Sequence, residues 1–87
     1  MYLPLKIEIF EEGDVYVAVC PQLNVSSFGE TVEDARVSLR EAIGAFIEEC
    51  QAMGTLDEVL EEAGFSRKNQ DWVPRSPVVE DRIALFL

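Results

Sequence analysis

An amphipathic segment between Gly29 and Gly54 restricts the folds open to this chain more than any other stretch does. Its apolar residues recur at three- and four-residue spacing, at Val32, Ala35, Leu39, Ala42, Ile43, Phe46, Ile47 and Cys50. That spacing is typical of a helix that buries one face. Thr31 suits the N-cap position, and Gly54 suits the residue that follows the last turn. We therefore predict a helix that ends near residue 50, spans roughly 28 Å and closes the core over a small sheet.

Three strands are predicted before this helix. Apolar and polar residues alternate from residue 3 to residue 9, which indicates a half-buried first strand. Residues 11–14 then suit a hairpin loop, and Val15–Cys20 is rich in β-branched residues, as a second strand is. This second strand lacks alternation, so we expect cover on both of its faces, with the helix and a second subunit as candidates. Residues 23–28 form a weaker third strand.

Three further segments follow the long helix. Thr55 and Glu58 have the spacing of a capping box, which predicts a short helix over residues 55–63. Residues 66–77 show no period and are predicted to form a loop anchored by Trp72. Residues 78–87 alternate in part and predict a final strand that is apolar on both faces. Such a strand needs a partner within the sheet or across a subunit boundary.

The predicted fold is therefore α+β, with one long helix packed on one face of an antiparallel sheet in the order β-β-β-α-α-β. The 87 residues form one domain, with the β-β-β-α core in residues 1–50. A chain of this length buries only about 60–65% of its unfolded surface, so its own core is modest. We expect it to form at least a dimer, either a dimer or a tetramer.

The charge balance restricts the possible partners. Seventeen acidic residues against seven basic ones give a net charge of −10. This negative field repels phosphate, so we expect no direct binding to nucleic acid or to an anionic membrane. A basic protein partner is favoured instead; the alternative is that the acidity serves only solubility.

The sequence contains no histidine, which removes the usual activators of serine and cysteine nucleophiles. Cys20 and Cys50 lack C-x-x-C spacing, so we expect buried free thiols in a reducing cytoplasm and no metal or cofactor. Residues 1–12 do not resemble a signal peptide, and the longest apolar run is too short to cross a bilayer. We expect a cytoplasmic protein without enzymatic activity.

Four runs of residues together resemble the HicB-like antitoxin family. They are Gly13–Ala18, Cys20–Leu23, Gly29–Ala35 and Leu39–Ala42, and the resemblance covers residues 2 to about 50. It implies a β-β-β-α-β core, likened to a partly reduced ribonuclease H fold. It also implies that the protein binds and masks a small basic, mRNA-cleaving HicA-like toxin whose catalytic residue is a histidine.

The chain departs from this family pattern in two places. Many members have Leu-Pro-Gly where this sequence has Leu23-Asn24-Val25, which affects the shape of one turn. Many members also continue into a helix-turn-helix or ribbon-helix-helix domain that binds operator DNA. Here only residues 65–87 follow the second helix, without helical period. The resemblance therefore implies a short form that has the neutralising function and lacks the DNA-binding domain.

The candidate partner-binding residues are four glutamates on the predicted long helix and the single tryptophan: Glu33, Glu41, Glu48, Glu49 and Trp72. The alternative for the glutamates is an ordinary solvated helix face. The alternative for Trp72 is packing over the sheet rather than anchoring an interface. Tyr16 is expected to be a core residue.

Two other functions remain open from the sequence. Carboxylates gather around the first hairpin, at Glu8, Glu11, Glu12 and Asp14, and a metal-assisted nuclease would need several of them to converge on a divalent cation. We favour a solvated loop there. The other alternative to an antitoxin is a structural or regulatory homo-oligomer of the same fold with no toxin partner.

Overall fold

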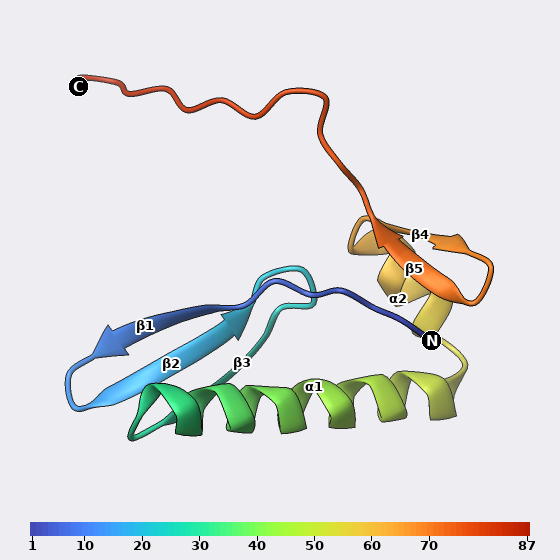
Figure 1. Ribbon diagram of the computed structural model, residues 1–87, viewed down its shortest axis with the longest axis horizontal. Coiled ribbons are helices and arrows are strands. Elements are labelled where there is room, and N and C mark those ends of the chain that lie inside the picture. The colour runs from blue at the N-terminus through green and yellow to red at the C-terminus, as the bar shows by residue number, and fades with distance from the viewer.

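A computed structural model describes residues 1–87. A three-stranded antiparallel sheet lies over one long helix, and a short helix and a two-stranded hairpin close one end (Figure 1). The elements in chain order are β1 (Glu8–Glu12), β2 (Val15–Cys20), β3 (Val25–Gly29), α1 (Val32–Met53), α2 (Leu56–Glu62), β4 (Phe65–Lys68) and β5 (Asp71–Pro74). The α+β class and the order of strands and helices agree with the prediction.

The sheet is ordered β1-β2-β3, and its register decides which residues face the helix. The hairpin between β1 and β2 turns through two residues, and Gly13 takes a φ of +59°, as such tight turns require. Ile9 pairs with Ala18, and Ala18 pairs with Ser27, so these three share one face. Ala18 and Cys20 on that face are completely buried. The helix therefore covers this side of β2, as predicted.

The long helix α1 has both of the predicted caps. The Asp34 N–H donates to Oγ1 of Thr31 at 3.0 Å, and Gly54 follows the helix in the left-handed conformation with a φ of +72°. The helix ends three residues later than the stripe predicted. Thr55, in contrast, makes no side-chain bond to α2, and its hydroxyl donates instead to the Cys50 carbonyl at 3.4 Å. The predicted capping box of α2 is not formed.

Strand β1 begins at Glu8, later than the alternation from residue 3 predicted. Residues 1–7 are not part of a strand. Pro4 has no N–H to donate, and the Lys6 N–H donates to Oε1 of Gln22 at 2.8 Å instead of to a neighbouring strand. Leu3 and Leu5 still pack against the core, so the alternation reflects burial without a sheet ladder.

Residues 65–74 form a hairpin, and the prediction of a loop there was wrong. The strands β4 and β5 are only four residues long, and the turn between them contains Asn69 with a φ of +60°. Asparagine tolerates this conformation, and it was the one sequence signal for the hairpin. The hairpin is tied to the N-terminus because the Trp72 N–H donates to the Tyr2 carbonyl at 2.9 Å.

The strand predicted over residues 78–87 is not formed within this chain. These residues, which we call the C-terminal arm, have no regular secondary structure and are exposed throughout. Figure 1 shows the arm leaving β5 and running back over the sheet on the side opposite α1. No strand lies beside it, so its backbone has no sheet to join.

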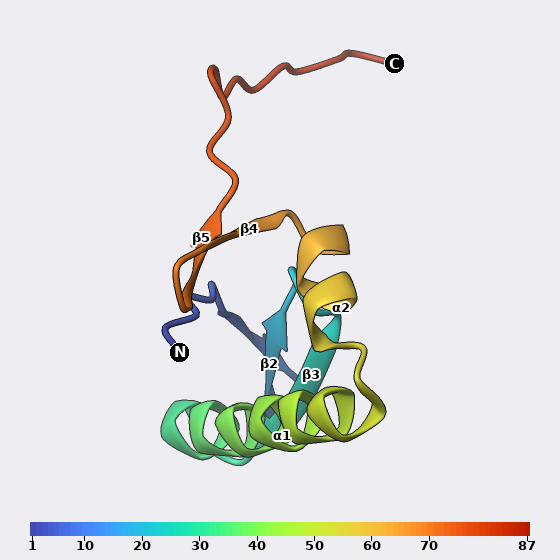
Figure 2. The same cartoon turned by 90° about the vertical axis from the view of Figure 1, so that its right-hand side faces the viewer.

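One hydrophobic core connects the sheet and α1 to the short helix α2 and to the hairpin of β4 and β5. It comprises ten buried residues: Ala18, Cys20, Leu23, Ala35, Leu39, Cys50, Leu56, Leu60, Phe65 and Trp72. Figure 2 shows this end of the molecule, with α2 on the same side of α1 as the sheet and with β4 and β5 farther from α1. Cys20 and Cys50 are buried free thiols, as predicted, and Tyr16 packs against the core.

Candidate partner-binding surface

The carboxylates of this protein all lie at its surface. Each of the seventeen acidic residues is exposed. Only two ion pairs form, between Glu33 and Arg36 at 2.5 Å and between Asp57 and Arg67 at 3.1 Å. Most of the negative charge is therefore available to a cationic partner.

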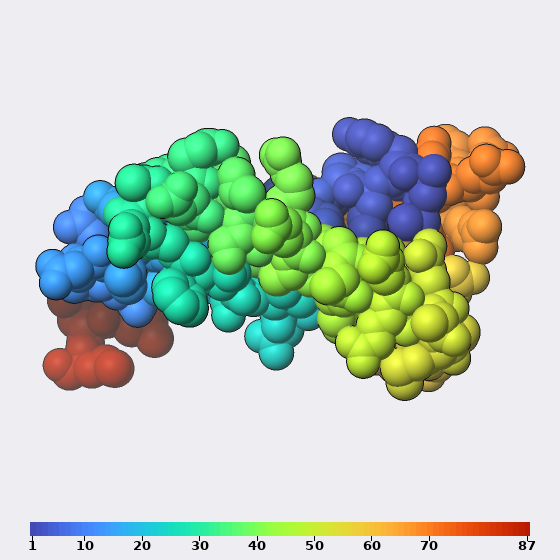
Figure 3. Space-filling model, turned by 90° about the horizontal axis from the view of Figure 1, so that it is seen from below, coloured from blue at the N-terminus to red at the C-terminus, as the bar shows by residue number.

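The outer side of α1 presents a row of carboxylates. Glu41 and Glu48 are seven residues apart, which places them about 20° apart around the helix axis and about 10 Å apart along it. Asp34 precedes Glu41 by the same spacing, and all three are exposed. We call Asp34, Glu41 and Glu48 the acidic row. Figure 3 shows that α1 is uncovered along its length on this side of the molecule.

The other two predicted glutamates do not join this row. Glu33 and Glu49 are sixteen residues apart, so they lie on opposite flanks of α1, about 160° apart around its axis. Glu33 is also paired with Arg36. The four predicted glutamates therefore do not share one face. Asp34 was not among the predicted residues, although its seven-residue spacing from Glu41 is visible in the sequence.

Trp72 lies in β5 and is only 2% exposed. The Arg67 guanidinium lies over its ring, 5.8 Å from the centroid. The structure therefore shows the packing alternative for Trp72, with the indole inside the core and not presented to a partner.

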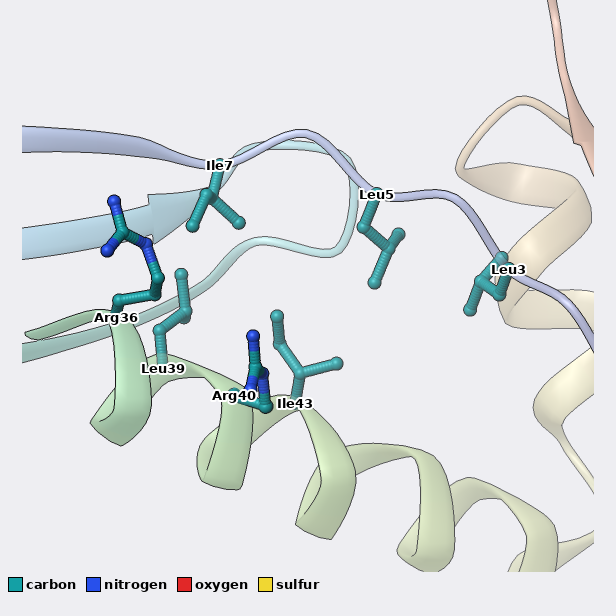
Figure 4. Close-up of a pocket in the computed structure, with 7 residues that line it drawn as sticks. All are labelled: Leu3, Leu5, Ile7, Arg36, Leu39, Arg40 and Ile43. Atoms are coloured by element: carbon teal, nitrogen blue, oxygen red, sulfur yellow. The ribbon is translucent and has the colours of Figure 1, made fainter. Parts of the chain in front are cut away.

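An apolar groove of about 460 Å³ lies between the N-terminal segment and α1. Figure 4 shows Leu3, Leu5 and Ile7 pointing towards the helix, while Leu39 and Ile43 point back from it. Arg36 and Arg40, one helical turn apart, also line it. The groove contains no acid, base or nucleophile, so its chemistry is that of a binding surface. The sequence analysis did not predict this groove, because it forms only where the N-terminal segment lies beside α1.

The hairpin carboxylates do not converge. Glu8 and Glu12 alternate with Glu11 along β1, so Glu11 points to the opposite face of the sheet. No group of three or more His, Cys, Asp or Glu side chains is placed to hold a metal ion. Ser27 is hydrogen-bonded to Ser38, where it links β3 to α1.

Neither helix combines the length and the apolar composition needed to cross a membrane. No protein-family model matches the chain, and neither the curated proteins nor the solved structures give a significant match. The HicB-like resemblance therefore stays a prediction from the sequence.

Proposed function

We propose that this protein is an antitoxin that binds a small basic, RNA-cleaving toxin and occludes its RNA-binding surface. The observation that carries the proposal is the exposed acidic row on α1, which belongs to a surface of net charge −10 with only two ion pairs. An RNA-binding protein presents cations to phosphate, so an acidic surface is complementary to it. The HicB-like resemblance of residues 2–50 indicates a HicA-like toxin as the cationic partner.

The proposed mechanism is stoichiometric masking. The carboxylates of the acidic row would occupy the positions that RNA phosphates take on the toxin, and RNA would then be excluded. A single exposed ion pair contributes only about 0.2–1 kcal/mol, so the affinity depends on many such pairs acting together. The long-range field also accelerates encounter with a cationic partner.

Co-expression with a small basic protein encoded beside this gene tests the proposal. We expect the two proteins to co-purify, and we expect this chain to relieve the growth arrest that the basic protein causes. If the two neither co-purify nor show this relief, the antitoxin proposal is wrong.

A charge-reversal pair tests the acidic row itself. Glu41→Lys with Glu48→Lys should weaken toxin binding by roughly tenfold or more, since both substitutions place a cation against a cationic surface. The control is Glu61→Lys with Glu62→Lys on α2, where both residues are also exposed and the net charge changes equally. Equal loss of affinity in the two variants, measured by calorimetry, would contradict docking at the acidic row.

A homo-oligomer of this fold without a toxin is the second candidate. It is favoured by exposed apolar residues such as Phe10 and Phe28, which an acidic docking surface does not use. The neighbouring reading frame decides between the two functions. A basic, histidine-containing product of toxin size supports the antitoxin, and its absence supports the homo-oligomer.

A further inference from the structure

The face of the sheet opposite α1 is uncovered and carries a row of apolar side chains, with Glu8 and Glu12 of β1 at its edge on the same face. Phe10, Val17 and Phe28 lie opposite one another across β1, β2 and β3, and they form a row in which Phe10 is 51% and Phe28 is 68% exposed. Val15 and Val19 flank Val17 on the same face and are half-buried. Figure 1 shows no helix or strand packed on this side. We call these five residues the open face.

The C-terminal arm is a second apolar surface without cover. Ile83, Leu85 and Leu87 alternate with Ala84 and Phe86, so the last five residues of the arm are apolar on both sides when extended, after the charged run of residues 80–82. Ile83 is 83% exposed and Phe86 is 100% exposed. The arm leaves the body on the same side as the open face (Figures 1 and 2).

The single chain also exposes more surface than a folded monomer of its size does. Its accessible area is 6966 Å², whereas a compact protein of 9.8 kDa exposes about 5,200 Å². Its radius of gyration is 15.4 Å, against about 12 Å for a compact domain of this length. The excess area exceeds the roughly 800 Å² that each partner buries in a standard interface.

We propose that two copies of this chain associate through their open faces and exchange their C-terminal arms, so that the arm of each copy lies on the open face of the other. An arm folded onto its own sheet would have only one of its apolar sides covered. Between two facing sheets both sides are covered, which matches the composition of residues 83–87. This inference does not depend on the antitoxin proposal.

Exposed substitutions test the interface without disturbing the fold of one chain. We expect the full-length protein to sediment as a dimer, and we expect Phe28→Glu and Phe86→Glu each to raise the dimer dissociation constant by roughly tenfold or more. The control is Met53→Glu at the end of α1, because Met53 is 68% exposed, the same as Phe28. A full-length monomer at micromolar concentration would overturn the proposal. The proposal would also be overturned if neither phenylalanine substitution raised the dimer dissociation constant.

A disulfide distinguishes arm exchange from an arm folded onto its own chain. The double variant Phe28→Cys with Leu85→Cys should form, on oxidation, a covalent dimer that is visible on a non-reducing gel. Cys20 and Cys50 do not compete because both are buried. An intramolecular disulfide at monomer mass, or no covalent dimer at all, would overturn the exchange.

Discussion

At the scale of single residues, Gly29 shows how closely β3 and α1 approach each other. A Cβ atom at Gly29 would lie 2.5 Å from the Ala35 nitrogen and 2.7 Å from the Asp34 carbonyl carbon. Both are backbone atoms of the first turn of α1, so they cannot rotate away as a flexible side chain would. The glycine is needed for this close approach between strand and helix.

Replacing Gly29 with alanine should therefore lower the free energy of unfolding by about 1–3 kcal/mol, the usual cost of forced overpacking. Gly44→Ala is the control, because Gly44 lies within α1 and a Cβ there meets nothing within 4 Å. That change should raise the free energy of unfolding by about 0.5–1 kcal/mol. Urea unfolding followed by circular dichroism measures both. Similar shifts in the two variants would contradict the tight junction.

Leu39 and Val37 offer a second comparison on the same helix. Leu39 is 1% exposed and Val37 is 42% exposed. Leu39→Ala should lower the free energy of unfolding by about 2–5 kcal/mol, because it leaves a cavity beneath the sheet. Val37→Ala should change it by about 0.5 kcal/mol or less, as surface substitutions usually do. A larger loss from Val37→Ala would show that the buried face of α1 is assigned wrongly.

At the scale of elements, the two threonines that precede the helices have different roles. The Thr31 side chain accepts a hydrogen bond from the first turn of α1, whereas the Thr55 side chain makes none with α2. Thr31→Ala should lower the thermal midpoint and cost about 1 kcal/mol, because it leaves a helix N–H unpaired. Thr55→Ala should cost less, because the only hydrogen bond of its side chain is the long one to the Cys50 carbonyl. An equal loss in both variants would indicate that Thr55 also caps its helix.

The elements differed in how well the sequence predicted them. The stripe that predicts α1 repeats over many turns, so its position and both caps agree with the structure. Strands β4 and β5 have four residues each, too few for an alternation to be distinguished from a loop. The arm has the alternation of a strand, but a strand also needs a neighbour, and this chain supplies none.

At the scale of the whole molecule, the net charge of −10 has opposite effects on the two proposed associations. Raising the salt from about 0.01 M to about 0.1 M shortens the screening length from about 30 Å to about 10 Å. Two copies of an acidic chain then repel each other less, so self-association should strengthen. Binding to a basic toxin should weaken, because its attraction is screened.

Sedimentation at both salt concentrations measures self-association, and calorimetry with the basic partner measures toxin binding. Glu61→Lys with Glu62→Lys is a useful control, since it lowers the charge without touching the acidic row or the open face. This variant should form the dimer more readily at low salt. Dimers that dissociate as salt rises would contradict an interface made of apolar surfaces.

The candidate site was predicted only in part. That the glutamates of α1 are exposed follows from the helical period alone, as does the burial of Leu39 on the other side. The same helical period also shows that Glu33 and Glu49 lie away from the acidic row, so this part was available from the sequence as well. The groove that contains Arg36 and Arg40 needs the N-terminal segment beside α1, which no local pattern specifies.

The sequence by itself determined the long helix, its caps, the second strand and the acidic charge, because each depends on neighbouring residues or on composition. Only the tertiary structure decided the place of Trp72, since its burial depends on a hairpin that is held by Tyr2 at the far end of the chain. It alone also revealed the open face, because a strand's period shows which residues share a side but not what covers that side. Helices, caps and strands are determined by residues a few positions apart in the sequence. Burial depends instead on contacts between segments that are distant in sequence.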